Sequence, residues 1–303
     1  MFRPASVLFG FIFLVVVGFP GVTFGQNKAL PASLTQDQWA GAKQSINLPT
    51  GITMKYIEMG QADGPPLIFL HGMTDNSRSW SLLVPYFTDK YHVYMLDQRG
   101  HGDTDKPDLR MFSLAMYAAD LAAFMEAKNI DKAHIVGHSL GGMIAQAFAM
   151  NYPEKTMRLA MIGTAVPGRG SHELMYGLYG AVAAFGDNRP DDEFMAAWYS
   201  NPNPVDEDFL KREMAESKNI TPSAWRAIAK GAAVADLSSF MEEIKAPTLI
   251  MWGSADAFMS SELQDALRKA IPRAEFIAYD KHGHNLQWEI PETMARDLLK
   301  FLE

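Results

Sequence analysis

The sequence predicts an α/β protein with a doubly wound, mostly parallel sheet and a helical cap inserted into it. Three observations support this prediction. Short, almost continuously apolar runs alternate with longer segments of helical periodicity. These runs end at Asp, Gly or His, and one Ala- and Met-rich helical stretch interrupts the alternation. Continuous apolar runs are typical of strands buried on both faces, as in parallel sheets.

Composition restricts the classes of function. The 303 residues are 48% hydrophobic and 20% charged, which indicates a globular protein and excludes disordered or collagen-like chains. Lys and Arg number 27 against 35 Asp and Glu, and no basic stripe is present, so we expect no nucleic-acid partner. The absence of Cys excludes thiolate nucleophiles and zinc–thiolate sites. Catalysis must therefore use oxygen or nitrogen side chains.

Residues 1–25 have the pattern of a signal peptide. Arg3 precedes the apolar run Val7–Phe19, which is followed by Pro20 and by small residues up to Gly25. A membrane-spanning helix needs about 20 apolar residues, so a retained anchor is the weaker alternative. We expect cleavage near Gly25 and an exported protein, periplasmic or extracellular, without a stable membrane anchor.

The sheet domain is predicted in two parts, 51–165 and 238–303, after an irregular N-terminal arm at 26–50. The arm is polar and contains prolines, which favours irregular structure. The predicted strands are Leu67–Leu70, Val93–Leu96, Ala133–Val136, Leu159–Ile162, Thr248–Trp252 and Glu275–Tyr279. The predicted helices include Leu114–Lys128, Gly142–Tyr152 and Pro291–Leu302.

The segment 166–237 is predicted to form the helical cap. It contains helical patterns at 174–185, 193–199 and 223–235, the last two separated by the Pro-rich sequence NPNPV, and it contains no convincing strand. We interpret it as an insertion and not as a second full domain.

A candidate nucleophile lies in HIVGHSLGG at 134–142. Gly137, Ser139 and Gly141 fill the G-x-S-x-G pattern, directly after a predicted strand and before a predicted helix. Glycine at both flanks permits a tight turn that exposes the serine hydroxyl, and the N–H of Leu140 would face developing negative charge. The alternative is a Gly-rich turn with an unreactive serine.

His284 and Asp256 are the candidate base and acid. His284 lies in KHGHN before the last predicted helix, and Asp256 follows the predicted strand Thr248–Trp252, so both belong at the edge of the sheet where Ser139 lies. Asp97 and Asp103 are competing acids with weaker context. A metal site at His282 and His284 is another alternative, but no carboxylate cluster completes a ligand set there.

These motifs together resemble the α/β-hydrolase superfamily, in its esterase- and lipase-like group with a helical cap. The resemblance extends from about Gly51 to Glu303 and includes FLHGM at 69–73, LDQRGHGDTDKP at 96–107, PTLIMWGSAD at 247–256 and GHNLQWEIPE at 283–292. Thr104 stands where the family usually has serine. The resemblance implies the α/β-hydrolase fold and a Ser139, Asp256 and His284 triad. It also implies backbone donors at Met73 and Leu140 for an oxyanion. We expect no cofactor and no metal.

The predicted function is that of an exported serine hydrolase acting on a small-molecule carboxylic ester or lactone through an acyl-enzyme. A C–C bond hydrolase, an acyltransferase, a perhydrolase and a non-catalytic small-molecule receptor remain alternatives. Epoxide hydrolases and haloalkane dehalogenases would carry Asp in place of Ser139. We also expect Trp80, His138 and Trp288 to contact substrate. Core packing is the alternative for the tryptophans, and loop support is the alternative for His138.

Overall fold

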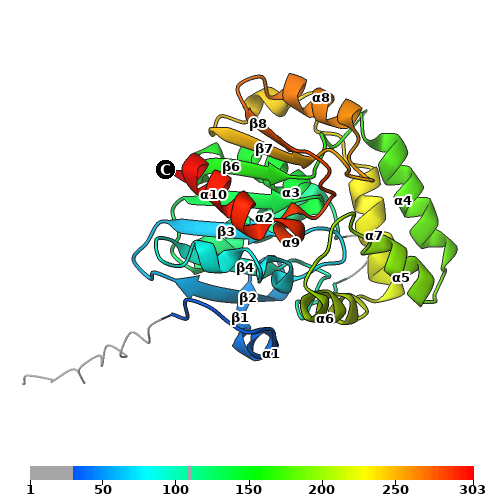
Figure 1. Cartoon of the computed structure of the whole chain (residues 1–303), viewed down its shortest axis with the longest axis horizontal. Helices are drawn as coiled ribbons and strands as arrows, with labels where there is room; N and C mark the ends of the chain where they lie inside the picture. The colour runs from blue at the N-terminus through cyan, green and yellow to red at the C-terminus, as the bar shows by residue number, and fades with distance from the viewer. Residues whose placement is uncertain (1–29, 108–110, 169) are drawn as a thin grey trace, which may run out of the picture.

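The computed structural model describes residues 30–107, 111–168 and 170–303. The predicted signal peptide at 1–25 lies outside these ranges. A single sheet runs through the molecule with helices on both faces, and further helices lie beyond one end of its strands (Figure 1).

The sheet has eight strands in the order β1-β2-β4-β3-β5-β6-β7-β8. The pairs β1–β2 and β2–β4 are antiparallel and all other pairs are parallel, which confirms a mostly parallel sheet. The strands are β1 (Gln44–Leu48), β2 (Ile52–Gly60), β3 (Pro66–Leu70), β4 (His92–Asp97), β5 (Ala133–His138), β6 (Thr156–Ile162), β7 (Thr248–Gly253) and β8 (Glu275–Tyr279). The predicted apolar runs correspond to β3 through β8.

The prediction of an irregular arm at 26–50 is wrong for its second half. This segment forms helix α1 (Gln36–Trp39), a 3-10 turn and the edge strand β1. β1 is largely solvent-exposed, and its order comes from backbone pairing with β2, so its composition carries no strand signal. In α1, Asp37 forms an ion pair with Arg212 of the cap at 2.8 Å.

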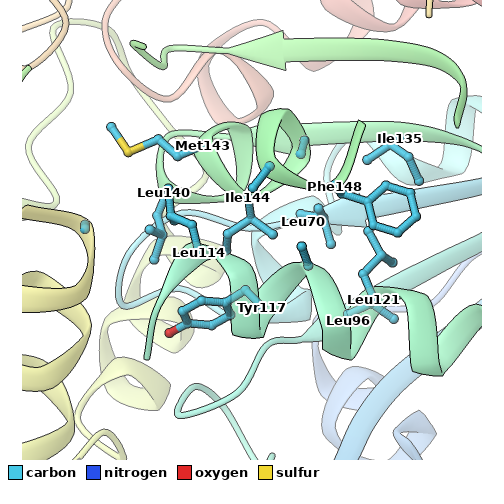
Figure 2. Close-up of a cluster of buried hydrophobic side chains, with 14 of the residues drawn as sticks. Leu70, Leu96, Leu114, Tyr117, Leu121, Ile135, Leu140, Met143, Ile144 and Phe148 are labelled. Atoms are coloured by element: carbon cyan, nitrogen blue, oxygen red, sulfur yellow. The ribbon is translucent and has the colours of Figure 1, made fainter. Parts of the chain in front are cut away.

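Helices α2 (Leu114–Ala127) and α3 (Leu140–Asn151) bury one face of the sheet, and α10 (Pro291–Leu302) buries the other. Figure 2 shows the first of these cores, where Leu121 of α2 and Phe148 of α3 lie near Leu96 and Ile135 of the strands. Two further helices, α8 (Ser261–Ala270) and α9 (Leu286–Glu289), complete the domain. Among the described residues, none of the helices is long and apolar enough to cross a membrane.

The cap consists of α4 (His172–Ala184), α5 (Asp192–Trp198), α6 (Glu207–Ser217) and α7 (Pro222–Ala233), which lie together beside the sheet domain (Figure 1). The sequence did not predict α6, because it is strongly polar. Its buried residues are Phe209, Glu213 and Ser217, which lie four apart on one face. That face packs on the sheet domain, where the N–H of Asn76 donates to the Glu213 carboxylate at 3.2 Å.

Candidate active site

Ser139 occupies a tight turn between β5 and α3. Its φ of +50° lies in a region that side chains rarely adopt. Gly137 and Gly141 make the turn possible. A Cβ on Gly137 would lie 2.3 Å from the Gly141 carbonyl oxygen, and one on Gly141 would lie 2.0 Å from the Leu70 carbonyl oxygen. The Ser139 carbonyl accepts a hydrogen bond from Thr164 Oγ1 at 2.8 Å. The surrounding loops thus hold the serine in a strained conformation.

His284 and Asp256 form a hydrogen-bonded pair at the carboxyl ends of β7 and β8. His284 Nδ1 lies 2.8 Å from Asp256 Oδ2, and the Asp256 side chain is fully buried. The other carboxylate oxygen, Oδ1, accepts from the N–H groups of Phe258 and Met259 at 2.8 and 2.9 Å. Because a carboxylate only accepts, His284 Nδ1 carries a proton, and in the neutral imidazole Nε2 then presents a lone pair. That tautomer is the one a general base needs.

Ser139 and His284 line the same cavity. Within the described part of the chain, the Ser139 hydroxyl makes no hydrogen bond to the His284 ring. The structure thus brings these two predicted residues to one cavity.

The competing acids have other contacts. Asp97 accepts hydrogen bonds from Lys43 Nζ at 2.7 Å, from the Ser77 N–H at 2.8 Å and from the Asp103 N–H at 2.9 Å. The Asp103 side chain is half exposed and also contacts Lys43. Both carboxylates hold loops together, and Asp256 is the acid in contact with His284.

The predicted oxyanion residues Met73 and Leu140 both line this cavity, and Leu140 is the first residue of α3. His71 holds the loop before Met73. Its Nε2 accepts from the Gln98 N–H at 3.0 Å, and Gln98 Nε2 donates to the His71 carbonyl at 2.7 Å. Burial lowers the pKa of His71 to about 3, so this imidazole is neutral.

The cavity wall is mainly apolar. The predicted substrate contacts His138 and Trp288 line it, and Trp80 does not. Trp80 is fully buried in the core, with its ring centroid 4.9 Å from that of Phe69, so the expectation that it binds substrate is wrong. The apolar lining residues are Met73, Leu140, Met143, Met175, Leu178, Trp198, Ala232, Phe258, Met259 and Trp288. Among the described residues, no Lys or Arg lines the cavity.

Asp75 is a cavity residue that the sequence analysis missed. Burial raises the pKa of Asp75 to about 7, although attraction to His284 acts in the opposite direction. His138 Nε2 donates to the His284 carbonyl at 3.0 Å, so its Nδ1 presents a lone pair to Asp75 Oδ2, 3.8 Å away. Burial lowers the pKa of His138 well below its usual value, so this contact is not an ion pair at neutral pH. No sequence pattern marks an Asp in FLHGMTD as buried.

Comparison with known proteins agrees with this geometry. A family model described as alpha/beta hydrolase fold matches residues 65–291. The 2-hydroxy-6-oxononadienedioate/2-hydroxy-6-oxononatrienedioate hydrolase of Comamonas testosteroni is 29% identical over 266 residues, which cover 79% of this chain and 88% of that protein. Lipase 1 of Psychrobacter immobilis is 26% identical over 254 residues, which cover 80% of this chain and 78% of that protein.

Solved structures show the same fold. A hydrolase from Pseudomonas aeruginosa PA01 matches with a TM-score of 0.77 at 23% identity, over 87% of this chain and 99% of that one. At this identity the likeness supports the fold alone. The family model, in contrast, matches well over half of the sequence and includes the turn at Ser139, Asp256 and His284. The chain therefore belongs to the alpha/beta hydrolase fold family.

Proposed function

We propose that this protein is a serine hydrolase that cleaves neutral carboxylic esters or lactones through an acyl-enzyme on Ser139. The observation that carries the proposal is the Asp256–His284 pair, which leaves His284 Nε2 as an acceptor in the cavity that Ser139 also lines. In this mechanism Nε2 takes the hydroxyl proton while Ser139 Oγ bonds to the acyl carbon. The proton then passes to the leaving alcohol, and water repeats the cycle to release the acid.

The developing oxyanion would be stabilised by the N–H groups of Met73 and Leu140. Both residues line the cavity, and Leu140 stands at the N-terminus of α3, where backbone N–H groups have no partner within the helix. Loss of one such donor costs roughly 2.7 to 4 kcal/mol of transition-state stabilisation in a well-studied protease. Because these donors are backbone groups, replacing the Met73 side chain should affect turnover less than moving its backbone.

The charge of the cavity favours a neutral ester or lactone over a dianionic substrate of C–C bond hydrolysis. The Comamonas relative is named for a dioate, which is a dianionic substrate. In this chain no described Lys or Arg lines the cavity, and the carboxyl group of Asp75 does. Burying a carboxylate without a cation or several donors is costly. A neutral acyl group fits this wall better, and the lipase relative agrees with an ester substrate.

The C–C bond hydrolase remains the second candidate because of the 29% identity to that relative. We would assay neutral aryl esters and lactones of graded acyl size beside a 2-hydroxy-6-oxo-dienedioate, with Ser139→Ala as control. Ester turnover that Ser139→Ala abolishes, with secondary structure retained, would support the proposal. Cleavage of the dioate without ester turnover would replace it by the second candidate. Ligand binding without turnover of any substrate would indicate a receptor.

We also propose that the protein is exported. The support is the pattern of the first 25 residues, in which Arg3 precedes an apolar run that ends before Pro20. Mass spectrometry of protein recovered from cell fractions should find a new N-terminus near Gln26. Protein that keeps residues 1–25 and stays in the cytoplasm would contradict export.

A further inference from the structure

The Pro-rich cap loop at 201–203 lies against the loop at 281–285 that carries His284. We propose that Asn201 and Asn203 of this cap loop hold the His284 loop in its productive position, so that the cap serves catalysis as well as enclosing substrate. The inference rests on the proposed role of His284 as the base. It identifies two positioning residues, since neither asparagine lines the cavity that holds Ser139.

The first contact is made by Asn201. Asn285 follows His284 directly, is buried, and lines the cavity. Its Nδ2 donates to Asn201 Oδ1 at 3.0 Å. The cap loop therefore supplies an acceptor to the residue after the base.

The second contact is made by Asn203. Its Nδ2 donates to the Lys281 carbonyl at 2.8 Å and to Glu289 Oε2 at 2.6 Å. Both partners can only accept, which fixes the orientation of the amide and uses both of its hydrogens. Lys281 has a φ of +60°, so the Asn203 bond is made to a strained turn at the start of the His284 loop.

Glu289 connects Asn203 to Gly283, the residue before His284. Its side chain is fully buried, and its two oxygens accept from the Gly283 N–H at 3.0 and 3.1 Å. His282 Nδ1 lies 3.2 Å from Oε2 and also 3.2 Å from Asn203 Nδ2, and it donates to Oε2 because a carboxylate only accepts. Pro202 packs against Gly283, since a Cβ on Gly283 would lie 2.5 Å from Pro202 Cδ. The neighbours of His284 on both sides thus depend on the cap loop.

Loss of these contacts should move the His284 ring relative to Ser139. His284 lies in this loop and lines the same cavity as Ser139, so the distance between its Nε2 and the Ser139 hydroxyl depends on the position of the loop. Misplacement of a reacting group by about 1 Å can cost 10²-fold in rate. Because Asn201 and Asn203 lie outside the cavity wall, we expect the loss in kcat and not in KM.

The same substitution at the two positions separates positioning from general damage. Asn201→Asp loses the donor to the Tyr199 carbonyl, 2.9 Å away, but keeps the acceptor for Asn285. Because the contact with the His284 loop is kept, we expect kcat within about 3-fold of wild type on a short aryl ester. Asn203→Asp removes the donor and places a carboxylate against Glu289. We expect kcat to fall roughly 10- to 100-fold with little change in KM. Asn219→Asp, on an exposed residue of the cap, is the matched control for added charge.

A second measurement does not depend on activity. Backbone hydrogen exchange in a peptide covering 281–285 should become at least about 10-fold faster in Asn203→Asp and stay unchanged in Asn219→Asp. Asn201→Ala replaces Asn203→Asp if that variant does not fold. It removes the acceptor for Asn285 and also the Asn201 donor to the Tyr199 carbonyl, and Asn201→Asp, which lacks the same donor, is its control. Wild-type exchange and kcat in a folded Asn203→Asp or Asn201→Ala protein would overturn the inference. Wild-type protein that hydrolyses no ester would instead reject the proposed function, while the exchange result still decides whether the cap loop holds the His284 loop.

Discussion

Asp256 Oδ2 lies 2.8 Å from His284 Nδ1, and Asp256 Oδ1 is held by two backbone N–H groups of the loop that follows β7. These two hydrogen bonds hold the Asp256 carboxylate in place independently of its contact with the imidazole. It determines which ring nitrogen carries the proton, and it would stabilise the imidazolium formed when Ser139 loses its proton.

Replacement of Asp256 by Asn should lower kcat by roughly 10³- to 10⁴-fold, because an amide no longer selects the Nδ1–H tautomer. Ester kinetics and circular dichroism would measure the loss and the retained fold. Asp103→Asn is the matched control, since the Asp103 side chain is half exposed and contacts Lys43. Near-normal turnover in Asp256→Asn would reject Asp256 as the acid.

The strained backbone at Ser139 predicts a difference between two inactive variants. Ser139→Ala keeps a Cβ at a φ of +50°, whereas Ser139→Gly removes it. We expect the Gly variant to be more stable to urea than the Ala variant by about 1 kcal/mol, because relief of the strain exceeds the entropy cost of Gly. Equal stabilities would indicate that the turn is not strained.

Gly141 should not tolerate a side chain. A Cβ there would lie 2.0 Å from the Leu70 carbonyl oxygen, so Gly141→Ala should destabilise the protein by at least about 2 kcal/mol. Gly177 in α4 is the control, since a Cβ there meets nothing within 4 Å. Gly177→Ala should stabilise by about 0.5 to 1 kcal/mol. Thermal unfolding of both variants tests the pair, and a stable Gly141→Ala protein would contradict the packing.

Asp75 predicts a pH dependence of stability. Between about pH 4 and 7 the folded protein keeps a proton on Asp75 that the unfolded chain has released, because burial raises the pKa of Asp75 to about 7. Stability is therefore lost as the pH rises through this range. Asp75→Asn carries no such proton, so its stability relative to wild type should increase between pH 4 and 8, by at most about 4 kcal/mol.

Other groups around Asp75 must be accounted for in that experiment. His138, His284, Tyr199 and Glu213 all interact with it, and burial also raises the pKa of Glu213 well above its usual value. Glu213→Gln should be measured in parallel, since its contribution has the same sign. If the difference in free energy of unfolding between Asp75→Asn and wild type does not vary with pH, Asp75 is ionised across the range and the prediction is wrong.

The parts of the fold that the sequence predicted are those with a strong local pattern. β5 is buried at every position, and the glycines around Ser139 leave few other conformations for that turn. β1 and α6 were missed because they are mostly polar and owe their order to partners distant in the sequence. The order of the motifs was enough to place Asp256 and His284 together, whereas no local pattern separates the core Trp80 from the cavity residue Trp288.

The contacts of the cap loop also limit how this protein can be recombined with its relatives. A chimaera that exchanges 166–237 for the cap of another hydrolase would break the pairing of Asn203 with Lys281 and Glu289. A cap exchange should therefore transfer substrate specificity only when the donor's segment around its own histidine is exchanged together with the cap. The two segments form one unit for protein engineering.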